Sequence, residues 1–225
     1  MCFSANASFS AGVVLTVIGI AALRKVQHPS QVMFAAIPLL FAAQQIAEGA
    51  LWLLLPANGN PDSIKFLTYF FLFFAQVLWP LWVPVALLMV EKESTRKKGQ
   101  KLLACIGVLV ALYLGYCLLS FPVQAEITGY HVYYTQHYPA AFKVLGGLLY
   151  VIATIVPPFF SHIKRMWLLG LTVLVSYIIS TVFYDHYVVS VWCFFASIIS
   201  ISVYIIMAQI TRLHTSIILI KNTKL

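Results

Sequence analysis

Residues 66–90 read FLTYFFLFFAQVLWPLWVPVALLMV, a run without a single Asp, Glu, Lys or Arg. A helix rises about 1.5 Å per residue, so this run is long enough to cross a hydrocarbon core about 30 Å thick. It stops at the polar segment EKESTRKKGQK, residues 91–101. An apolar run of this length, ended by a basic segment, predicts a membrane-spanning helix.

The same pattern recurs along the whole chain of 225 residues, of which 62% are hydrophobic and 9% charged, with a mean hydropathy of +0.93. Soluble domains carry roughly 25% charged residues, so this chain has too few charges to cover a surface that faces water. We therefore expect an all-α, polytopic transmembrane bundle formed by residues 1–225 as a single domain. Its seven predicted spans run at about 8–25, 32–55, 64–90, 102–121, 140–160, 166–184 and 188–211.

The cations predict how this bundle is oriented. Short loops rich in Lys and Arg stay on the cytoplasmic side of a membrane. Of the 14 Lys and Arg residues, all but Lys65 and Lys143 fall in the first, third and fifth connections between spans or in the C-terminal tail. The sequence therefore predicts a multi-pass protein of the cell membrane with its N-terminus outside and its C-terminus in the cytoplasm. Because topology accounts for the net charge of +8, we expect no nucleic-acid partner.

Glu48 is the most informative polar residue, because it lies inside a predicted span. An ionisable side chain at mid-membrane costs roughly 2.5–3.5 kcal/mol, so such residues usually face the bundle interior and mark functional sites. Gln45, Glu48 and Trp52 follow each other at i, i+3 and i+7, on one face of the helix. Glu48 is therefore a candidate catalytic acid or base. The alternative is a structural hydrogen bond to a neighbouring helix.

Further polar and aromatic side chains fall in the predicted outer half of the bundle, whereas the cations mark the inner face. This asymmetry predicts a polar and aromatic pocket that opens outward. The candidate ligand-binding residues are Gln45, Trp52, Gln76, Tyr116, Tyr177 and Trp192.

The longest predicted outer connection, residues 120–140, is rich in His and Tyr. Within it, His131, Tyr133, Thr135 and His137 alternate, as on one face of an extended segment. The candidate metal ligands are His131, His137, His186, Glu48 and Cys2. Ligands of these types suit zinc, iron or copper. The alternative is a group of His and Tyr side chains at the level of the lipid headgroups.

Three thiols, those of Cys2, Cys117 and Cys193, are predicted on the outer side. That side is normally oxidising, so a disulfide between two of them is one interpretation. The other is that Cys117 and Cys193 are small packing residues within helices. Both interpretations remain open at this point.

Three blocks carry a family resemblance: MCFSANASF at 1–9, PLLFAAQQIAEGALW at 38–52 and SVWCFFAS at 190–197. They resemble an uncharacterised family of small bacterial integral membrane proteins whose chains begin with MCFSA-x-ASF. The resemblance implies a multi-pass protein of the bacterial inner membrane, and it brings no established activity.

Two functions from different classes are compatible with these residues. The first is a membrane-embedded enzyme assisted by a metal or a redox group, with Glu48 as acid, base or ligand. The second is a non-catalytic sensor or a membrane module that binds a small lipophilic ligand from the bilayer. A transporter is less favoured, because the predicted inner half has few polar residues and the chain has no repeated halves. The oligomeric state is left open.

Overall fold

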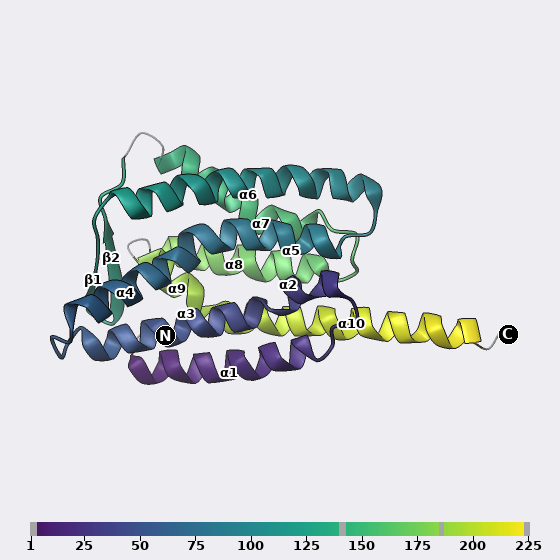
Figure 1. Cartoon of the computed structure of the whole chain (residues 1–225), viewed down its shortest axis with the longest axis horizontal. Coiled ribbons are helices and arrows are strands. Elements are labelled where there is room, and N and C mark those ends of the chain that lie inside the picture. The colour runs from purple at the N-terminus through teal and green to yellow at the C-terminus, as the bar shows by residue number, and fades with distance from the viewer. Residues whose placement is uncertain (1–3, 140–142, 185–186, 223–225) are drawn as a thin grey trace.

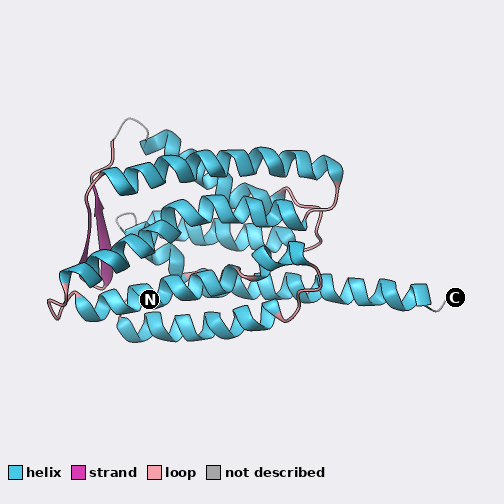
Figure 2. Cartoon of the chain, in the orientation of Figure 1, coloured by secondary structure: helices cyan, strands magenta, loops and turns pink. Residues whose placement is uncertain are grey.

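The predicted helical class is confirmed by the computed structural model, which describes residues 4–139, 143–184 and 187–222 (Figure 1). A two-stranded sheet that the fold prediction did not include lies across one end of the helical bundle (Figure 2). The elements are α1 (Ala5–Leu23), the 3-10 helix η1 (Pro29–Gln31), α2 (Val32–Ala35), α3 (Ile37–Leu54), α4 (Pro61–Leu72), the π-helical segment η2 (Phe73–Leu78), α5 (Trp79–Val90), α6 (Ser94–Ser120), β1 (Val123–Thr128), β2 (His131–Gln136), α7 (Lys143–Phe159), α8 (Met166–Phe183), α9 (Val188–Phe194) and α10 (Ala196–Asn222).

Among the described residues, 6 helices are long and apolar enough to cross a membrane: Ala5–Leu23, Pro29–Leu54, Pro61–Val90, Ser94–Ser120, Met166–Phe183 and Ser190–Arg212. They correspond to six of the seven predicted spans. The fifth predicted span, 140–160, contains a shorter apolar helix, Val144–Phe159. Large side chains on the outer face of α6, such as Leu109, Leu112 and Leu119, are mostly exposed. Such apolar surface suits a lipid environment better than water.

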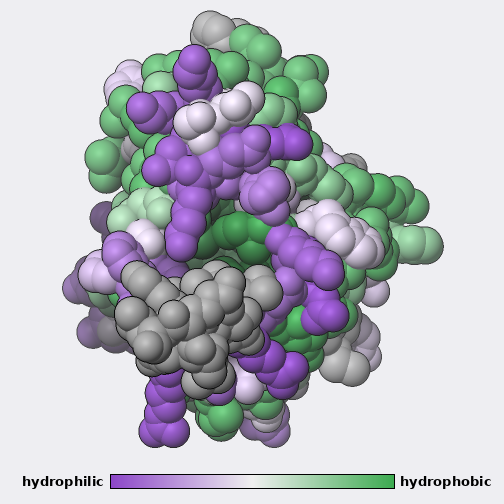
Figure 3. Space-filling view, turned by 90° about the vertical axis from the view of Figure 1, so that its right-hand side faces the viewer, coloured by the Kyte–Doolittle hydropathy of each residue, from purple (hydrophilic) through white to green (hydrophobic). Residues whose placement is uncertain are grey.

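The two ends of the bundle differ in chemistry. The strands β1 and β2 lie at one end, on the left in Figure 1, which we call the hairpin end. The connections from α5 to α6 and from α7 to α8 lie at the opposite end, which we call the basic end because they carry most of the Lys and Arg residues between helices. Figure 3 views the basic end and shows hydrophilic side chains gathered around an apolar recess.

The hairpin is held against the helices by its buried face. β1 and β2 are antiparallel, and Gly129 between them has a φ of 62°, in the left-handed region that favours glycine. Alternate side chains of a strand point to opposite faces. In β2, Val132 and Tyr134 are buried, and the ring of Tyr134 stacks on Phe71 of α4 at 4.8 Å between ring centroids. Tyr133 therefore lies on the opposite face of β2.

A π-helical segment interrupts the long helix between Pro61 and Val90, and Pro80 accounts for its position. The backbone N–H of Trp79 bonds to the carbonyl of Phe74, five residues back. In that register the carbonyl of Ala75 needs the N–H of residue 80, which proline lacks. The hydroxyl of Tyr150 on α7 donates to this carbonyl instead. The sequence of one helix thus creates a polar backbone group that the side chain of another helix satisfies.

The main apolar core lies toward the basic end. Its fully buried members come from α1, α2, α5, α8 and α10 and include Phe34, Leu87, Met166 and Met207. Burying a side chain of this size contributes roughly 1.5–3 kcal/mol relative to leaving it in water. This core packs together helices that also line the cavity described below.

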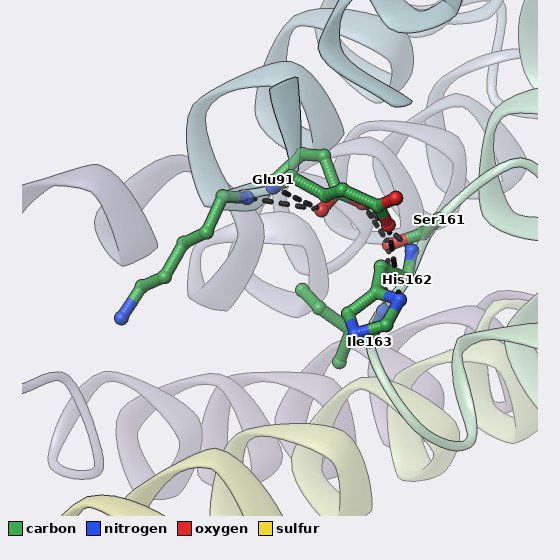
Figure 4. A network of polar contacts seen from close by, with 6 residues as sticks. Glu91, Ser161, His162 and Ile163 are labelled. Carbon is green, nitrogen blue, oxygen red and sulfur yellow. Dashed lines mark hydrogen bonds and ion pairs between the residues drawn. The ribbon is translucent and has the colours of Figure 1, made fainter. Parts of the chain in front are cut away.

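Glu91 is a buried carboxylate at the basic end, just after α5 (Figure 4). Its Oε1 accepts hydrogen bonds from the backbone N–H groups of Lys92 at 2.9 Å and Glu93 at 3.1 Å. Its Oε2 accepts from the Ser161 hydroxyl at 2.9 Å and from the His162 backbone N–H at 2.8 Å. The carboxylate therefore fastens the connection between α5 and α6 to the connection between α7 and α8.

The stability of the protein should depend on Glu91 in acid. Burial alone raises the pKa of Glu91, but the hydrogen bonds from the connecting loops outweigh burial and hold the pKa below its usual value of 4.5. A carboxylate whose folded-state pKa is lowered stabilises the fold above its unfolded-state pKa, and that stability is lost as the pH falls through the folded-state pKa. We therefore expect Tm in detergent to fall below about pH 4.5, and to fall less steeply in Glu91→Gln. Thermal unfolding across this range measures both slopes, and equal slopes would contradict the assignment.

Candidate ligand-binding cavity

A cavity of about 680 Å³ lies inside the bundle, between helices that are far apart in the sequence. This volume falls within the range of roughly 300–1,000 Å³ that is typical of small-molecule sites. The aromatic residues of its lining are Phe41, Trp79, Tyr113, Tyr133, Tyr134, Tyr138, Tyr150, Tyr177 and Trp192. Among the described residues, no Asp, Glu, Lys, Arg or His contributes to the lining. The walls are thus aromatic, with neutral polar groups only.

The lining changes along the length of the cavity. At the hairpin end it includes the hydrogen-bonding side chains of Tyr133 and Gln136 from β2. At the other end it includes Pro158, one residue before α7 stops, and Leu169, in the first turn of α8. Val83 of α5 adds to this apolar part. The cavity is therefore polar toward the hairpin end and apolar toward the basic end.

One face of α7 forms a wall of this cavity, and a glycine on that face adds to the open volume. Tyr150, Thr154 and Pro158 recur at i, i+4 and i+8 and all line it, so one face of α7 forms a wall. Gly147 lies on the same face and also lines the cavity. A Cβ added at Gly147 would meet no atom within 4 Å. The missing side chain at this position is thus part of the open volume.

Gln76 lies in the π-helical segment η2 and is 7% exposed. The hydroxyl of Tyr138 donates to Gln76 Oε1 at 2.8 Å. Burial raises the pKa of Tyr138, so its phenol stays protonated and remains a donor. Among the described residues, the side-chain amide of Gln76 is thus hydrogen-bonded through its oxygen. Short π-helical segments occur often at functional sites, which agrees with the place of Gln76 in the wall.

One aromatic pair of the wall joins α3 to α5. The rings of Phe41 and Trp79 stack with 4.0 Å between centroids and 27° between planes. The indole N–H of Trp79 donates to Gln44 Oε1 at 2.9 Å. Since the indole N–H already has a partner, Trp79 offers the cavity an apolar surface.

A second aromatic group joins α7, α8 and α9. The ring of Trp192 lies 5.2 Å from that of Tyr177 and 5.9 Å from that of Tyr150, in tilted and edge-to-face arrangements. The indole N–H of Trp192 donates to Ser176 Oγ at 3.1 Å. Such aromatic pairs contribute roughly 0.5–1.5 kcal/mol beyond the burial of their area, so this wall is well defined without a ligand.

Glu48 does not line the cavity. Its side chain is fully buried in α3, and the hydroxyl of Ser190 on α9 donates to Glu48 Oε1 at 2.6 Å. Gln45 is buried on the same side of α3, as its spacing predicted, and its Nε2 has no hydrogen-bond partner among the described residues. The structure thus places Glu48 at the contact between α3 and α9, outside the cavity lining.

The structure separates the residues predicted to bind a ligand into two groups. Gln76, Tyr177 and Trp192 line the cavity, whereas Gln45 and Trp52 do not.

Tyr116 is 64% exposed on the outer surface of α6 and lies outside the lining. Tyr113, about one turn earlier, lines the cavity in its place. Sequence reasoning overlooked Tyr113 and Tyr150, although the spacing of Tyr150, Thr154 and Pro158 along one helix face was a usable signal.

The predicted metal ligands are only partly described. Cys2 and His186 lie outside the described residues, and so does the side chain of Cys193. His131 stacks on Tyr187 with 4.4 Å between ring centroids, and burial lowers the pKa of His131 below its usual value.

His137 is exposed. Within the described part of the chain, no three His, Cys, Asp or Glu side chains form a group that could hold a metal ion. Cys105 and Cys117 are free thiols, and Cys117 is buried as the packing interpretation predicted. Among the described residues, Cys117 therefore forms no disulfide.

No curated protein and no solved structure matches the chain. A family model described as a family of unknown function, DUF6629, matches residues 1–216. The blocks at 1–9, 38–52 and 190–197 predicted an uncharacterised family, and the match includes all three of them. The chain therefore belongs to the DUF6629 family.

Proposed function

We propose that this protein binds an uncharged lipophilic molecule inside its helical bundle. The observation that carries the proposal is the cavity of about 680 Å³, whose walls are aromatic and include no charged side chain among the described residues. Transferring a charge into such a site without a partner costs several kcal/mol, so the cavity favours neutral ligands. Six apolar helices suggest a membrane protein, and a bilayer would supply such molecules.

The proposed arrangement in the membrane has seven spans. The helix Lys143–Phe159 is short, but it lies at the lower end of the length range that crosses a bilayer, about 17–25 residues. With seven spans, the cation-rich connections of the basic end lie in the cytoplasm, and the N-terminus and the hairpin end lie outside. The cavity would then take its ligand with the polar part outermost, in a bacterial inner membrane.

A metal- or redox-assisted enzyme, the first hypothesis from the sequence, has less support. Its acid or base, Glu48, is hydrogen-bonded to Ser190 and does not belong to the cavity wall. His131 and His137 also lie outside the lining. The binding proposal needs none of these residues, and it uses the side chains that surround the open volume.

Filling the cavity from Gly147 tests the proposed function. A side chain added there enters open space, so Gly147→Phe should fold normally and occlude the cavity. We expect wild-type protein, purified in mild detergent and extracted with organic solvent, to yield a bound lipophilic molecule in mass spectrometry. We expect Gly147→Phe to yield at least about tenfold less, a loss of about 1.4 kcal/mol or more in binding free energy.

The matched control for this variant is Leu148→Phe. It adds the same ring one residue further along α7, where Leu148 is 56% exposed and lies outside the cavity lining. The control should retain the wild-type amount of bound molecule. Equal amounts in all three proteins, or no lipophilic molecule in any of them, would contradict a ligand in this cavity.

A further inference from the structure

The amide of Gln76 presents a hydrogen-bond donor to the cavity. Gln76 is more than nine-tenths buried and lines the open volume. Its Oε1 already accepts from Tyr138, so the N–H groups of Nε2 are what this side chain can offer to a ligand. A ligand that accepts from Nε2 would add a hydrogen bond inside the cavity.

The acceptors beside this amide are already occupied. The hydroxyl of Tyr150 donates to the carbonyl of Ala75, which the π-helical geometry and Pro80 leave without a backbone donor. The hydroxyl of Tyr138 donates to the other atom of the Gln76 amide. The two acceptor groups of η2 thus each have a donor already, whereas the N–H groups of Gln76 Nε2 can donate to a ligand that brings an acceptor.

The opposite part of the cavity offers no such group. Val83, Pro158 and Leu169 form apolar walls toward the basic end. The stacked rings of Phe41 and Trp79 continue this apolar surface. A ligand held at Gln76 can therefore extend an apolar chain in this direction and bury it.

We infer that the ligand is an uncharged carbonyl compound with an apolar tail, whose carbonyl oxygen accepts a hydrogen bond from Gln76 Nε2. This inference rests on the proposed function and specifies its ligand class. Two sources share this chemistry in a membrane: a quinone ring that carries an alkyl or isoprenoid chain, and an ester of a fatty acid. The experiment below separates these sources from each other and from a purely apolar ligand.

The test compares three probes on the full-length protein in detergent: decyl-substituted benzoquinone, the methyl ester of a saturated fatty acid, and decylbenzene, which has no carbonyl group. Bound ligand raises Tm by mass action, so the dependence of Tm on probe concentration gives an apparent Kd. The variants are Tyr138→Phe and the double variant Gln76→Leu/Tyr138→Phe. Comparing these two removes the contribution of a Tyr138 hydroxyl left without its acceptor.

We expect the added Gln76→Leu change to weaken binding of at least one carbonyl probe about five- to tenfold, as the loss of one neutral hydrogen bond predicts. Binding of decylbenzene should change less than about twofold, which also shows that the cavity of the double variant is intact. A loss for benzoquinone alone identifies a ring carbonyl, and a loss for the ester alone identifies an acyl carbonyl.

Other results would overturn the inference. Unchanged affinity for both carbonyl probes would show that Gln76 does not donate to the ligand, even though a lipophilic molecule binds. An equal loss of affinity for decylbenzene would show that Gln76 affects binding through the shape of the cavity wall and not through a hydrogen bond. Absence of binding by all three probes to the wild-type protein would instead contradict the proposed function itself, and the two failures are thereby distinguished.

Discussion

Gly107→Ala is expected to lower the free energy of unfolding by about 3 kcal/mol, at the upper end of the cost of overpacking a core. A Cβ at Gly107 on α6 would lie 2.0 Å from the carbonyl oxygen of Pro80 and 3.0 Å from Cγ of Pro84. The first of these atoms belongs to the backbone of α5 and cannot rotate away. Accommodating the methyl group therefore requires the two helices to separate.

The proline pair in α5 explains why α6 comes so close at this point. Pro84 has no N–H, so the carbonyl of Pro80 lacks the donor that an α-helix normally supplies four residues later. The small surface of Gly107 lets the backbone of α6 approach this carbonyl. Small residues serve this purpose at many helix contacts in membranes. Separating α5 and α6 would also disturb η2, which precedes Pro80 and carries Gln76.

Gly115→Ala, two turns further along α6, is the matched control. Its added Cβ would meet only Val77, at 3.5 Å, an ordinary contact distance. Because alanine favours a helix over glycine by about 1 kcal/mol, this variant should be neutral or slightly more stable. Unfolding in mixed micelles with increasing SDS measures both variants against the wild type. A similar stability of Gly107→Ala and Gly115→Ala would contradict the close contact of α5 and α6.

The sequence predicted the helices well because hydrophobic runs of sufficient length can fold in few other ways in a membrane. The run at residues 66–90 is part of a helix that crosses the whole bundle. The π-helical segment within it was not predicted. That segment depends on Pro80 and on the hydroxyl of Tyr150, which is 75 residues from Ala75 in the sequence. Such a partnership becomes visible only when the two helices are placed side by side.

The candidate site was harder to predict, because the depth of a residue in the bundle says nothing about the direction of its side chain. Tyr113 and Tyr116 lie on the same helix within about one turn of each other, yet one lines the cavity and the other is exposed. A helix that is apolar on nearly all sides gives little periodic signal for its inner face. Glu91 was overlooked for a different reason. It follows α5 in a charged segment, and its burial depends on the connection between α7 and α8.

Glu48→Ala is expected to destabilise the protein by about 3 kcal/mol, with two contributions. The first is the volume lost from a fully buried side chain in α3, which leaves a cavity. The second is the hydrogen bond at 2.6 Å from the Ser190 hydroxyl, which would lose its acceptor. Glu48→Gln keeps the volume and an acceptor oxygen, so its free energy of unfolding should stay within about 1 kcal/mol of the wild type. Unfolding in SDS mixed micelles measures both variants.

A double-mutant cycle with Ser190→Ala separates the two contributions. If the hydrogen bond joins α3 to α9, the effects of Glu48→Gln and Ser190→Ala should be non-additive by roughly 0.5–3 kcal/mol, the range found for residues in contact. Additive effects would show that the two side chains do not depend on each other. In that case the destabilisation by Glu48→Ala does not arise from the hydrogen bond with Ser190.

The same variants distinguish the structural interpretation of Glu48 from the catalytic one. Because Glu48 lies outside the cavity lining, Glu48→Gln should leave the apparent Kd for a lipophilic probe within about twofold of the wild-type value. A structural carboxyl group changes stability when its volume and hydrogen bond are removed, and its conservative variant rescues that loss. A carboxyl group that exchanges protons with a substrate gives the opposite result, since Glu48→Gln then preserves stability and abolishes turnover. Loss of a chemical activity in Glu48→Gln at unchanged stability would therefore favour the enzyme over the binding protein proposed above.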